Sequence, residues 1–230
     1  ATFATAIYHV FMLFGLGVSY AITPLVATTK PANKKRRLIF LQNGLLVNIL
    51  LALTMSFIIL ALVPYLPFFG QAPLVTMAAT SYLKIISISL IPLMIFQTFR
   101  QFSEGQSNTF SPMIVSVLAN LINVLLNYVL IYGYWGFSEM GLNGAGYATL
   151  ISRFVMVVLM MILTREMWRG FIVHFDLKII NRLLKIGVPS GLQYVFEIGA
   201  FSMAGVMAGW ISAAALAAHQ IALNMVAVTY

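Results

Sequence analysis

One acidic residue stands out as able to carry chemistry in this chain. Glu197 is the only acidic side chain within any of the long apolar runs, and it lies near the centre of the run 186–210. A carboxylate in the middle of a bilayer costs about 2.5–3.5 kcal/mol on insertion scales, so such residues persist mainly where they bind ions, protons or substrates. Glu197 is therefore the candidate for cation or proton coupling and a candidate Na⁺ ligand. The simpler alternative is that it only pairs with a neighbouring helix.

Polar side chains accompany Glu197 along one face of the same run. At 100° per residue, Ser190, Gln193 and Tyr194 fall within about 60° of Glu197. We expect Gln193 and Tyr194 to line a substrate cavity. Pro189 removes a backbone donor, and the helix is expected to be interrupted there, as in the broken helices where transporters build ion sites.

Two further runs carry amide side chains at helical spacing. Asn120, Asn123 and Asn127 share one face of the run 112–132, and Gln220 and Asn224 are one turn apart in the run 213–230. All five are candidates for lining a substrate cavity. Hydrogen bonding between helices is the alternative, although such bonds average only about 0.6 kcal/mol in membranes.

A buried cation is expected in the fifth run. Arg153 lies about two turns inside the run 145–163, too deep for its side chain to reach the interface easily. It should point into the bundle, where Thr149 and Ser152 are its neighbours. Glu197 is a conceivable partner.

These side chains must be positioned by membrane-spanning helices. The chain has 230 residues, of which 61% are hydrophobic and 8% charged, with a mean hydropathy of +0.97. Soluble domains carry about 25% charged residues. Seven apolar runs are each near the length of a spanning helix, and they do not alternate like barrel strands. They are 4–27, 41–63, 80–99, 112–132, 145–163, 186–210 and 213–230. The sequence predicts an all-α integral membrane bundle.

Basic residues occupy every second connection between these runs. Lys and Arg are concentrated at 30–37, at Arg100 and at 165–185, whereas the connections 64–75, 133–144 and 210–213 contain none. The basic connections are therefore expected to face the cytoplasm. This distribution, and not a basic patch on one folded surface, explains the net charge of +8, so we expect no nucleic-acid partner.

Motifs for hydrolytic, metal-dependent or phosphate-binding chemistry are absent from the sequence. With one intramembrane carboxylate, this segment cannot assemble an acid–base pair, and we expect no enzyme and no cofactor beyond the coupling ion. The sequence contains no cysteine and does not begin with Met. We expect it to be an internal piece of a longer chain.

Several short motifs occur in a recognisable order. They are Phe96-Gln97-Thr98-Phe99-Arg100 with Gly105 and Pro112, Asn123-Val124-Leu125-Leu126-Asn127-Tyr128, Gly141-Leu142-Asn143-Gly144-Ala145-Gly146, Leu184-Lys185-Ile186-Gly187-Val188-Pro189, Phe196-Glu197 and Ala217-Ala218-His219-Gln220-Ile221-Ala222-Leu223-Asn224. Together they resemble the multidrug and toxic compound extrusion (MATE) family, in particular its bacterial NorM-type branch, over essentially the whole chain.

The resemblance implies a transporter of two six-helix lobes, of which this chain covers helices two to seven and part of eight. Residues 1–170 would form helices of the first lobe, 171–185 a cytoplasmic linker, and 186–230 the start of the second lobe. Family members exchange cationic, amphipathic compounds for Na⁺ or H⁺ across the bacterial cytoplasmic membrane, and we expect a monomer. Glu197 matches the family's coupling glutamate, and Asn123, Asn127 and Gln220 match cavity positions.

A flippase for lipid-linked precursors, from the same superfamily, is the alternative. Such proteins tend to have a more basic central cavity, and Arg153 is the only inward candidate for one here.

Overall fold

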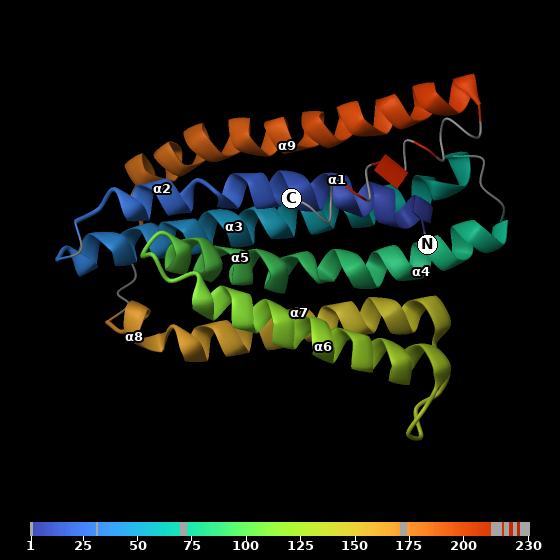
Figure 1. Cartoon of the computed structure of the whole chain (residues 1–230), viewed down its shortest axis with the longest axis horizontal. Coiled ribbons are helices and arrows are strands. Elements are labelled where there is room, and N and C mark those ends of the chain that lie inside the picture. The colour runs from blue at the N-terminus through green and yellow to red at the C-terminus, as the bar shows by residue number, and fades with distance from the viewer. Residues whose placement is uncertain are drawn as a thin grey trace.

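The computed structural model describes residues 2–30, 32–69, 73–170 and 174–212, together with residues 218, 221, 222 and 225. All regular elements of the described residues are helical. They are α1 (Thr2–Ser19), α2 (Ile22–Ala27), α3 (Lys34–Leu62), the 3-10 helix η1 (Val63–Phe69), α4 (Pro73–Ile88), α5 (Leu90–Glu104), α6 (Phe110–Tyr132), α7 (Gly141–Leu163), α8 (Arg165–Trp168) and α9 (Leu177–Ile211). The long helices run roughly along one axis (Figure 1).

Five predicted membrane spans are confirmed. Helical segments long and apolar enough to cross a membrane cover Ile7–Ala27, Lys34–Pro67, Ala79–Glu104, Phe110–Tyr132 and Gly141–Leu163. The sixth predicted span lies inside α9, and the seventh, 213–230, lies almost entirely outside the described residues.

The outside of the bundle is more apolar than parts of its inside. Phe57 and Val124 are 72% and 68% exposed, whereas Asn48 and Gln101 are each 1% exposed. A protein in water would not leave so many large apolar side chains uncovered. The chain is therefore a multi-pass membrane protein, as the sequence predicted.

Two prolines break helices that the sequence presented as continuous spans. The first span is divided between α1 and α2 at Tyr20, and the third between α4 and α5 at Ser89. Each break lies close to the fourth residue before a proline, Pro24 in one case and Pro92 in the other. A proline cannot donate to the carbonyl four residues back, and its ring clashes with that carbonyl.

The expected interruption at Pro189 is wrong, because α9 continues through it. Gly187 and Gly191, on either side of this proline, lie directly against Val18 and Phe14 of α1. This packing supports the helix where the proline removes one backbone hydrogen bond.

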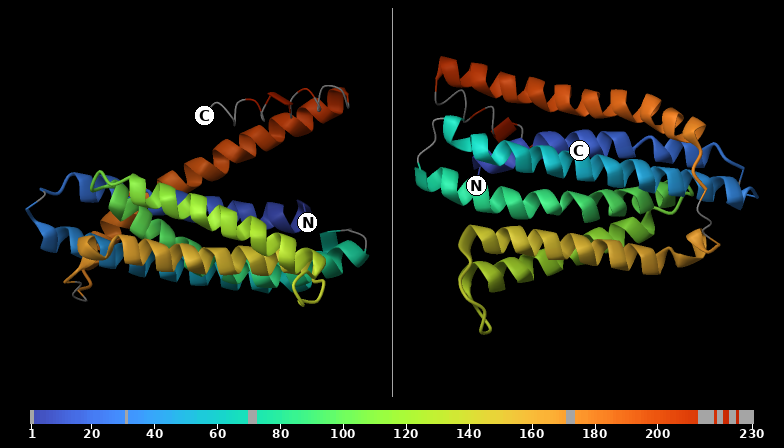
Figure 2. Two further views of the ribbon diagram at one scale, coloured as in Figure 1. Left: turned by 60° about the horizontal axis from the view of Figure 1, so that its bottom comes forward. Right: turned by 180° about the vertical axis from the view of Figure 1, so that it is seen from behind.

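The connection into α9 is shorter than predicted. Residues 177–185, expected to belong to a linker, already form the first turns of α9, and residues 171–173 lie outside the described part. The segment before the helix is fastened to α3 by side-chain amides. The backbone N–H of His174 donates to Gln42 Oε1, and that of Asp176 donates to Asn43 Oδ1, both at 3.0 Å. From this anchor α9 crosses α1 and then diverges from the bundle (Figure 2).

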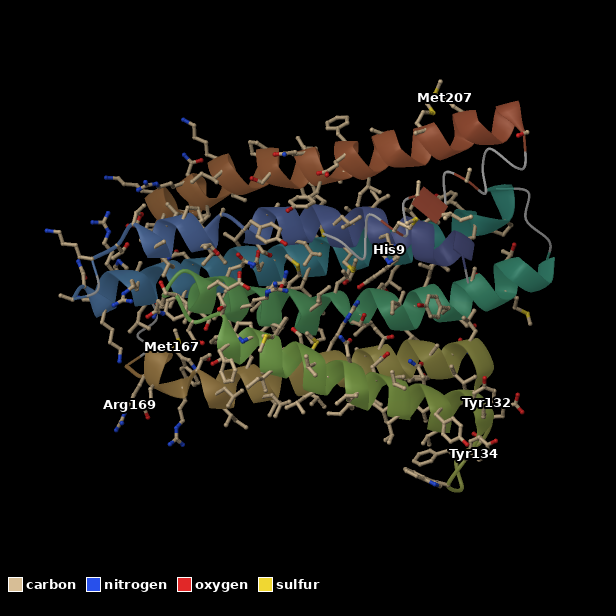
Figure 3. All side chains as sticks on the ribbon, viewed as in Figure 1. His9, Tyr132, Tyr134, Met167, Arg169 and Met207 are labelled. Carbon is tan, nitrogen blue, oxygen red and sulfur yellow. The ribbon has the colours of Figure 1, made fainter. Side chains whose placement is uncertain are left out.

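The two ends of the bundle differ in chemistry. Tyr128 and Tyr134 stack at 4.6 Å between ring centroids, with Tyr132 beside them, and Trp135 is 75% exposed. Figure 3 shows Tyr132 and Tyr134 at one end and Arg169 at the other. Aromatic residues at one edge of the apolar band and basic residues at the opposite end are typical of a membrane-embedded bundle.

Candidate functional site

Arg153 of α7 reaches the break between α4 and α5. Its Nη1 donates to the hydroxyl of Ser89 at 2.6 Å and to the Ser89 carbonyl at 3.4 Å, and it also donates to the hydroxyl of Tyr8 on α1. The guanidinium carbon lies 5.4 Å from the centre of the Tyr8 ring. The prediction that Arg153 points inward is confirmed, and its contacts join three parts of the bundle.

The partners of Arg153 are neutral. They are the Tyr8 hydroxyl, the Ser89 hydroxyl and carbonyl, and the sulfur of Met12 at 3.9 Å. Glu197 is not among them, because α7 and α9 lie on opposite sides of the helices between them (Figure 1). Hydrogen bonds and the ring face solvate this cation, but they leave its charge unbalanced within the described residues.

A second polar group is buried between α3 and α5. Asn48 Nδ2 donates to Thr98 Oγ1 at 2.7 Å, and the Thr23 hydroxyl contacts Gln101 Oε1 at 2.5 Å. Gln97 is 4% exposed, and its Oε1 has no hydrogen-bond partner in the structure. We did not predict a site here from the sequence. The sequence pattern that could have predicted this site is the polar pair Gln97 and Gln101, which lie one turn apart in an apolar span.

The asparagines of α6 take different positions. Asn123 Nδ2 donates to Ser152 Oγ of α7 at 3.1 Å, and Asn127 Nδ2 donates to Asn123 Oδ1 at 2.9 Å. Asn120 is exposed. The contact between Asn123 and Ser152 favours the alternative of hydrogen bonding between helices for that residue. Asn127 Oδ1 is buried without a partner and retains the capacity to accept a hydrogen bond.

The predicted residues of α9 lie on its exposed surface. Gln193, Tyr194 and Glu197 are all exposed, and Tyr194 stacks on Tyr20 with ring centroids 5.5 Å apart. Within the described part of the chain, Glu197 has no ion pair or hydrogen bond. Gln220 and Asn224 lie outside the described residues.

The described residues do not contain three or more His, Asp or Glu side chains grouped closely enough to hold a metal ion. On the exposed face of α9, the neighbours of Glu197 are the neutral Gln193 and Tyr194.

Glycines bring α9 into backbone contact with α1 just before these residues. A Cβ atom built on Gly17 would lie 2.5 Å from Gly191 Cα, and one on Gly191 would lie 2.7 Å from the Phe14 carbonyl. Gly199, two turns further along α9, has nothing within 4 Å. The two helices thus touch at Gly191, the space beside Gly199 is open, and Glu197 lies between those two positions along α9.

Comparison with known proteins shows that the chain is similar to membrane transporters. A family model described as MatE matches residues 1–129. A probable multidrug resistance protein NorM of Bradyrhizobium diazoefficiens is 33% identical over 243 residues, covering 100% of this chain and 51% of the relative. The multidrug resistance protein NorM of Photobacterium profundum is 28% identical over 231 residues, covering 96% of this chain and 50% of the relative.

A solved structure described as MATE in the bent conformation has the same fold. It matches with a TM-score of 0.76 at 19% identity, covering 97% of this chain and 50% of that one. The chain spans about half the length of the curated relatives it matches.

Proposed function

Because this chain belongs to the MatE family of membrane transporters, we propose that it forms about half of a cation-coupled exporter. The complete protein would expel small amphipathic organic cations across the bacterial cytoplasmic membrane in exchange for Na⁺ or H⁺. Two relatives named as multidrug resistance proteins support export of small drug-like compounds. In this proposal the protein acts as a monomer and needs no cofactor besides the coupling ion.

The position of Glu197 is the observation that carries this proposal. Its carboxylate stands in the middle of a helix of apolar composition, and it is exposed where α9 has begun to diverge from α1. An unpaired carboxylate at that depth is costly unless an ion, a proton or a cationic substrate compensates it. Glu197 would alternate between these partners. Gln193 and Tyr194, on the same exposed surface, would supply neutral hydrogen-bonding groups for varied substrates.

The anchor at α3 supports a lobe boundary near the start of α9. We assign residues 1–170 to the first lobe and the length of α9 beyond its first turns to the second. The contacts of His174 and Asp176 with Gln42 and Asn43 fix the connection between them. Divergence of α9 from α1 beyond Gly191 would then separate the lobes on the side that carries Glu197 (Figure 2).

The test is transport by the full-length protein in everted vesicles. Glu197→Gln keeps the size of the side chain and removes its negative charge, so we expect export of a cationic dye to be abolished under both Na⁺ and H⁺ gradients. Glu139→Gln is the matched control, because Glu139 is exposed in the connection between α6 and α7 and its loss should leave export unchanged. Wild-type export by Glu197→Gln under either gradient would contradict the proposal.

The second candidate function is that of a flippase for lipid-linked precursors, and the inward position of Arg153 is the observation that favours it. Its guanidinium is directed into the bundle and has only neutral partners in the described part of the chain. A flippase would translocate a lipid-linked precursor in reconstituted vesicles and would fail to export cationic dyes. An exporter would export the cationic dyes and would fail to translocate the lipid-linked precursor.

A further inference from the structure

Basic side chains surround two adjoining pockets between the start of α3 and the start of α9. The first pocket has a volume of about 490 Å³ and is lined by the cationic residues Lys35, Arg36, Lys178 and Arg182. The second has a volume of about 430 Å³ and is lined by Lys30, again with Arg36 and Arg182. Arg36 and Arg182 therefore face both. We call the two together the basic pocket.

The charges around the basic pocket are not balanced. Five cationic side chains line it, and Asp176 is the one carboxylate among its lining residues. The Oδ1 atom of Asp176 already accepts a hydrogen bond from the backbone N–H of Lys178 at 2.8 Å, at the first turn of α9. None of the five cations forms an ion pair within the described residues.

The preference for basic residues on one side of a membrane does not by itself produce this arrangement. Arg165 and Arg169 also lie at the basic end, and each approaches the carboxylate of Glu166, at 3.7 and 3.8 Å. The carboxylate of Glu166 thus partly balances the positive charge of Arg165 and Arg169. The cations of the basic pocket gather around a cavity instead, and Arg and Lys side chains that outnumber the one carboxylate there five to one are suited to binding a phosphate.

The basic pocket also has apolar side chains in its lining. Leu25, Ile39, Phe40 and Ile179 line it together with the polar Asn33, Thr28 and Thr29, and Phe40 is 2% exposed. The candidate membrane span that contains α3 begins at Lys34, so Arg36 lies in the first turn of that helix, at the basic end of the bundle. Figure 3 shows side chains ending in nitrogen at this end of the bundle. Cationic and apolar side chains around one cavity match an amphiphile better than a free ion.

We propose that the basic pocket binds the phosphate headgroup of an anionic phospholipid from the leaflet that faces the basic loops. Arg36 and Arg182 would both contact the phosphate, and the first part of the acyl chains would lie against the partly exposed Ile39 and Ile179. Basic pockets between spanning helices are suited to such headgroups. Because Arg36 belongs to α3 and Arg182 to α9, a bound lipid would join the start of α9 to the rest of the bundle. This inference does not depend on the transported substrate.

Thermal unfolding of the full-length protein in a neutral detergent tests the proposal, with three separate additions. Phosphatidylglycerol should raise the Tm of the wild-type protein, because a ligand that binds only the folded state stabilises it. Phosphatidylcholine, which has no net charge, and inorganic phosphate, which lacks acyl chains, should not. A shift with inorganic phosphate as large as that with phosphatidylglycerol would overturn the lipid assignment, and an equal shift with phosphatidylcholine would overturn the role of charge.

Paired variants separate this site from general attraction to an anionic surface. Arg36→Gln with Arg182→Gln removes two cations from the basic pocket, and we expect the apparent affinity for phosphatidylglycerol to fall about 30-fold. Arg165→Gln with Arg169→Gln removes the same charge beside Glu166 and should retain the wild-type affinity. Equal losses in both double variants would overturn the proposal.

Two further measurements guard against a variant that folds poorly. The Tm of each variant without lipid shows whether the substitutions alone destabilise the protein. Arg36→Lys with Arg182→Lys keeps both charges and should bind phosphatidylglycerol more tightly than the Gln pair. Phospholipid retained through purification, measured by native mass spectrometry, should follow the same order, and retention independent of these substitutions would contradict the proposed site.

Discussion

The contact between α1 and α9 can be tested by adding a single methyl group. In Gly17→Ala, the new Cβ would lie 2.5 Å from Gly191 Cα, 2.8 Å from Gly191 N and 2.9 Å from the Ser190 carbonyl oxygen. All three neighbours are backbone atoms, so no side chain can rotate away. Ordinary contact begins at 3.4 Å, and the helices must therefore move apart by about 0.9 Å at this point.

The energetic consequence can be bounded. Overpacking a well-packed contact costs about 1–3 kcal/mol, while replacing Gly by Ala inside a helix recovers about 1 kcal/mol of helix propensity. The helix propensity is gained whether or not α1 and α9 touch, so the closed contact itself loses about 1–3 kcal/mol. Because α9 is attached to the bundle through its first turns and the segment before them, separation of α1 from α9 can relieve the clash without unfolding. That loss corresponds to a decrease of about 5–150-fold in the population of the closed contact.

Disulfide cross-linking in the full-length protein, in a cysteine-free background, would measure that population. Tyr20 and Tyr194 stack beside the crossing with ring centroids 5.5 Å apart, so cysteines at these two positions report on its closure. We expect Gly17→Ala to slow cross-linking by about 5–150-fold. Gly199→Ala is the matched control on α9, since nothing lies within 4 Å of Gly199. It should leave the rate unchanged. If Gly17→Ala cross-links at the wild-type rate with wild-type thermal stability, α1 and α9 do not meet at these backbones.

Two further substitutions test the contacts of α7 in the full-length protein. Asn123→Ala removes the hydrogen bond to Ser152, so the free energy of unfolding should fall by about 0.6 kcal/mol, measured by reversible denaturation in detergent. An unchanged stability together with an altered substrate range would support the predicted cavity role of Asn123 instead. Arg153→Met should lower the Tm more than Arg153→Lys, because Lys can still donate to the Tyr8 and Ser89 hydroxyls. An equal decrease in Tm for both variants would mean that those hydrogen bonds contribute nothing to thermal stability.

The sequence determined the class of protein and the approximate limits of its spans. Hydropathy is a sum over neighbouring residues, so runs of apolar side chains identify membrane helices without knowledge of their partners. The inward direction of Arg153 was also readable, because a cation two turns inside a span has no favourable contact with lipid. Glu197 is conspicuous in the sequence as a carboxylate within an apolar run, and its coupling role stays a prediction.

The tertiary structure decided which residues meet. Arg153 finds Tyr8 and Ser89, which are 145 and 64 positions away in the chain, and no local pattern specifies such a pairing. Asn123 could donate a hydrogen bond to a cavity or to another helix, and only the fold shows that Ser152 of α7 lies opposite it.

Helix breaks and close contacts depended on tertiary structure for the same reason. A proline removes one hydrogen bond wherever it occurs, yet the spans containing Pro24 and Pro92 are broken while α9 continues through Pro189. Glycines spaced by four residues are common in apolar sequence, and only the packing of α1 identified Gly187 and Gly191 as a contact. Composition and periodicity are properties of a segment, whereas the support for a strained turn or a close approach comes from whichever helix the fold places beside it.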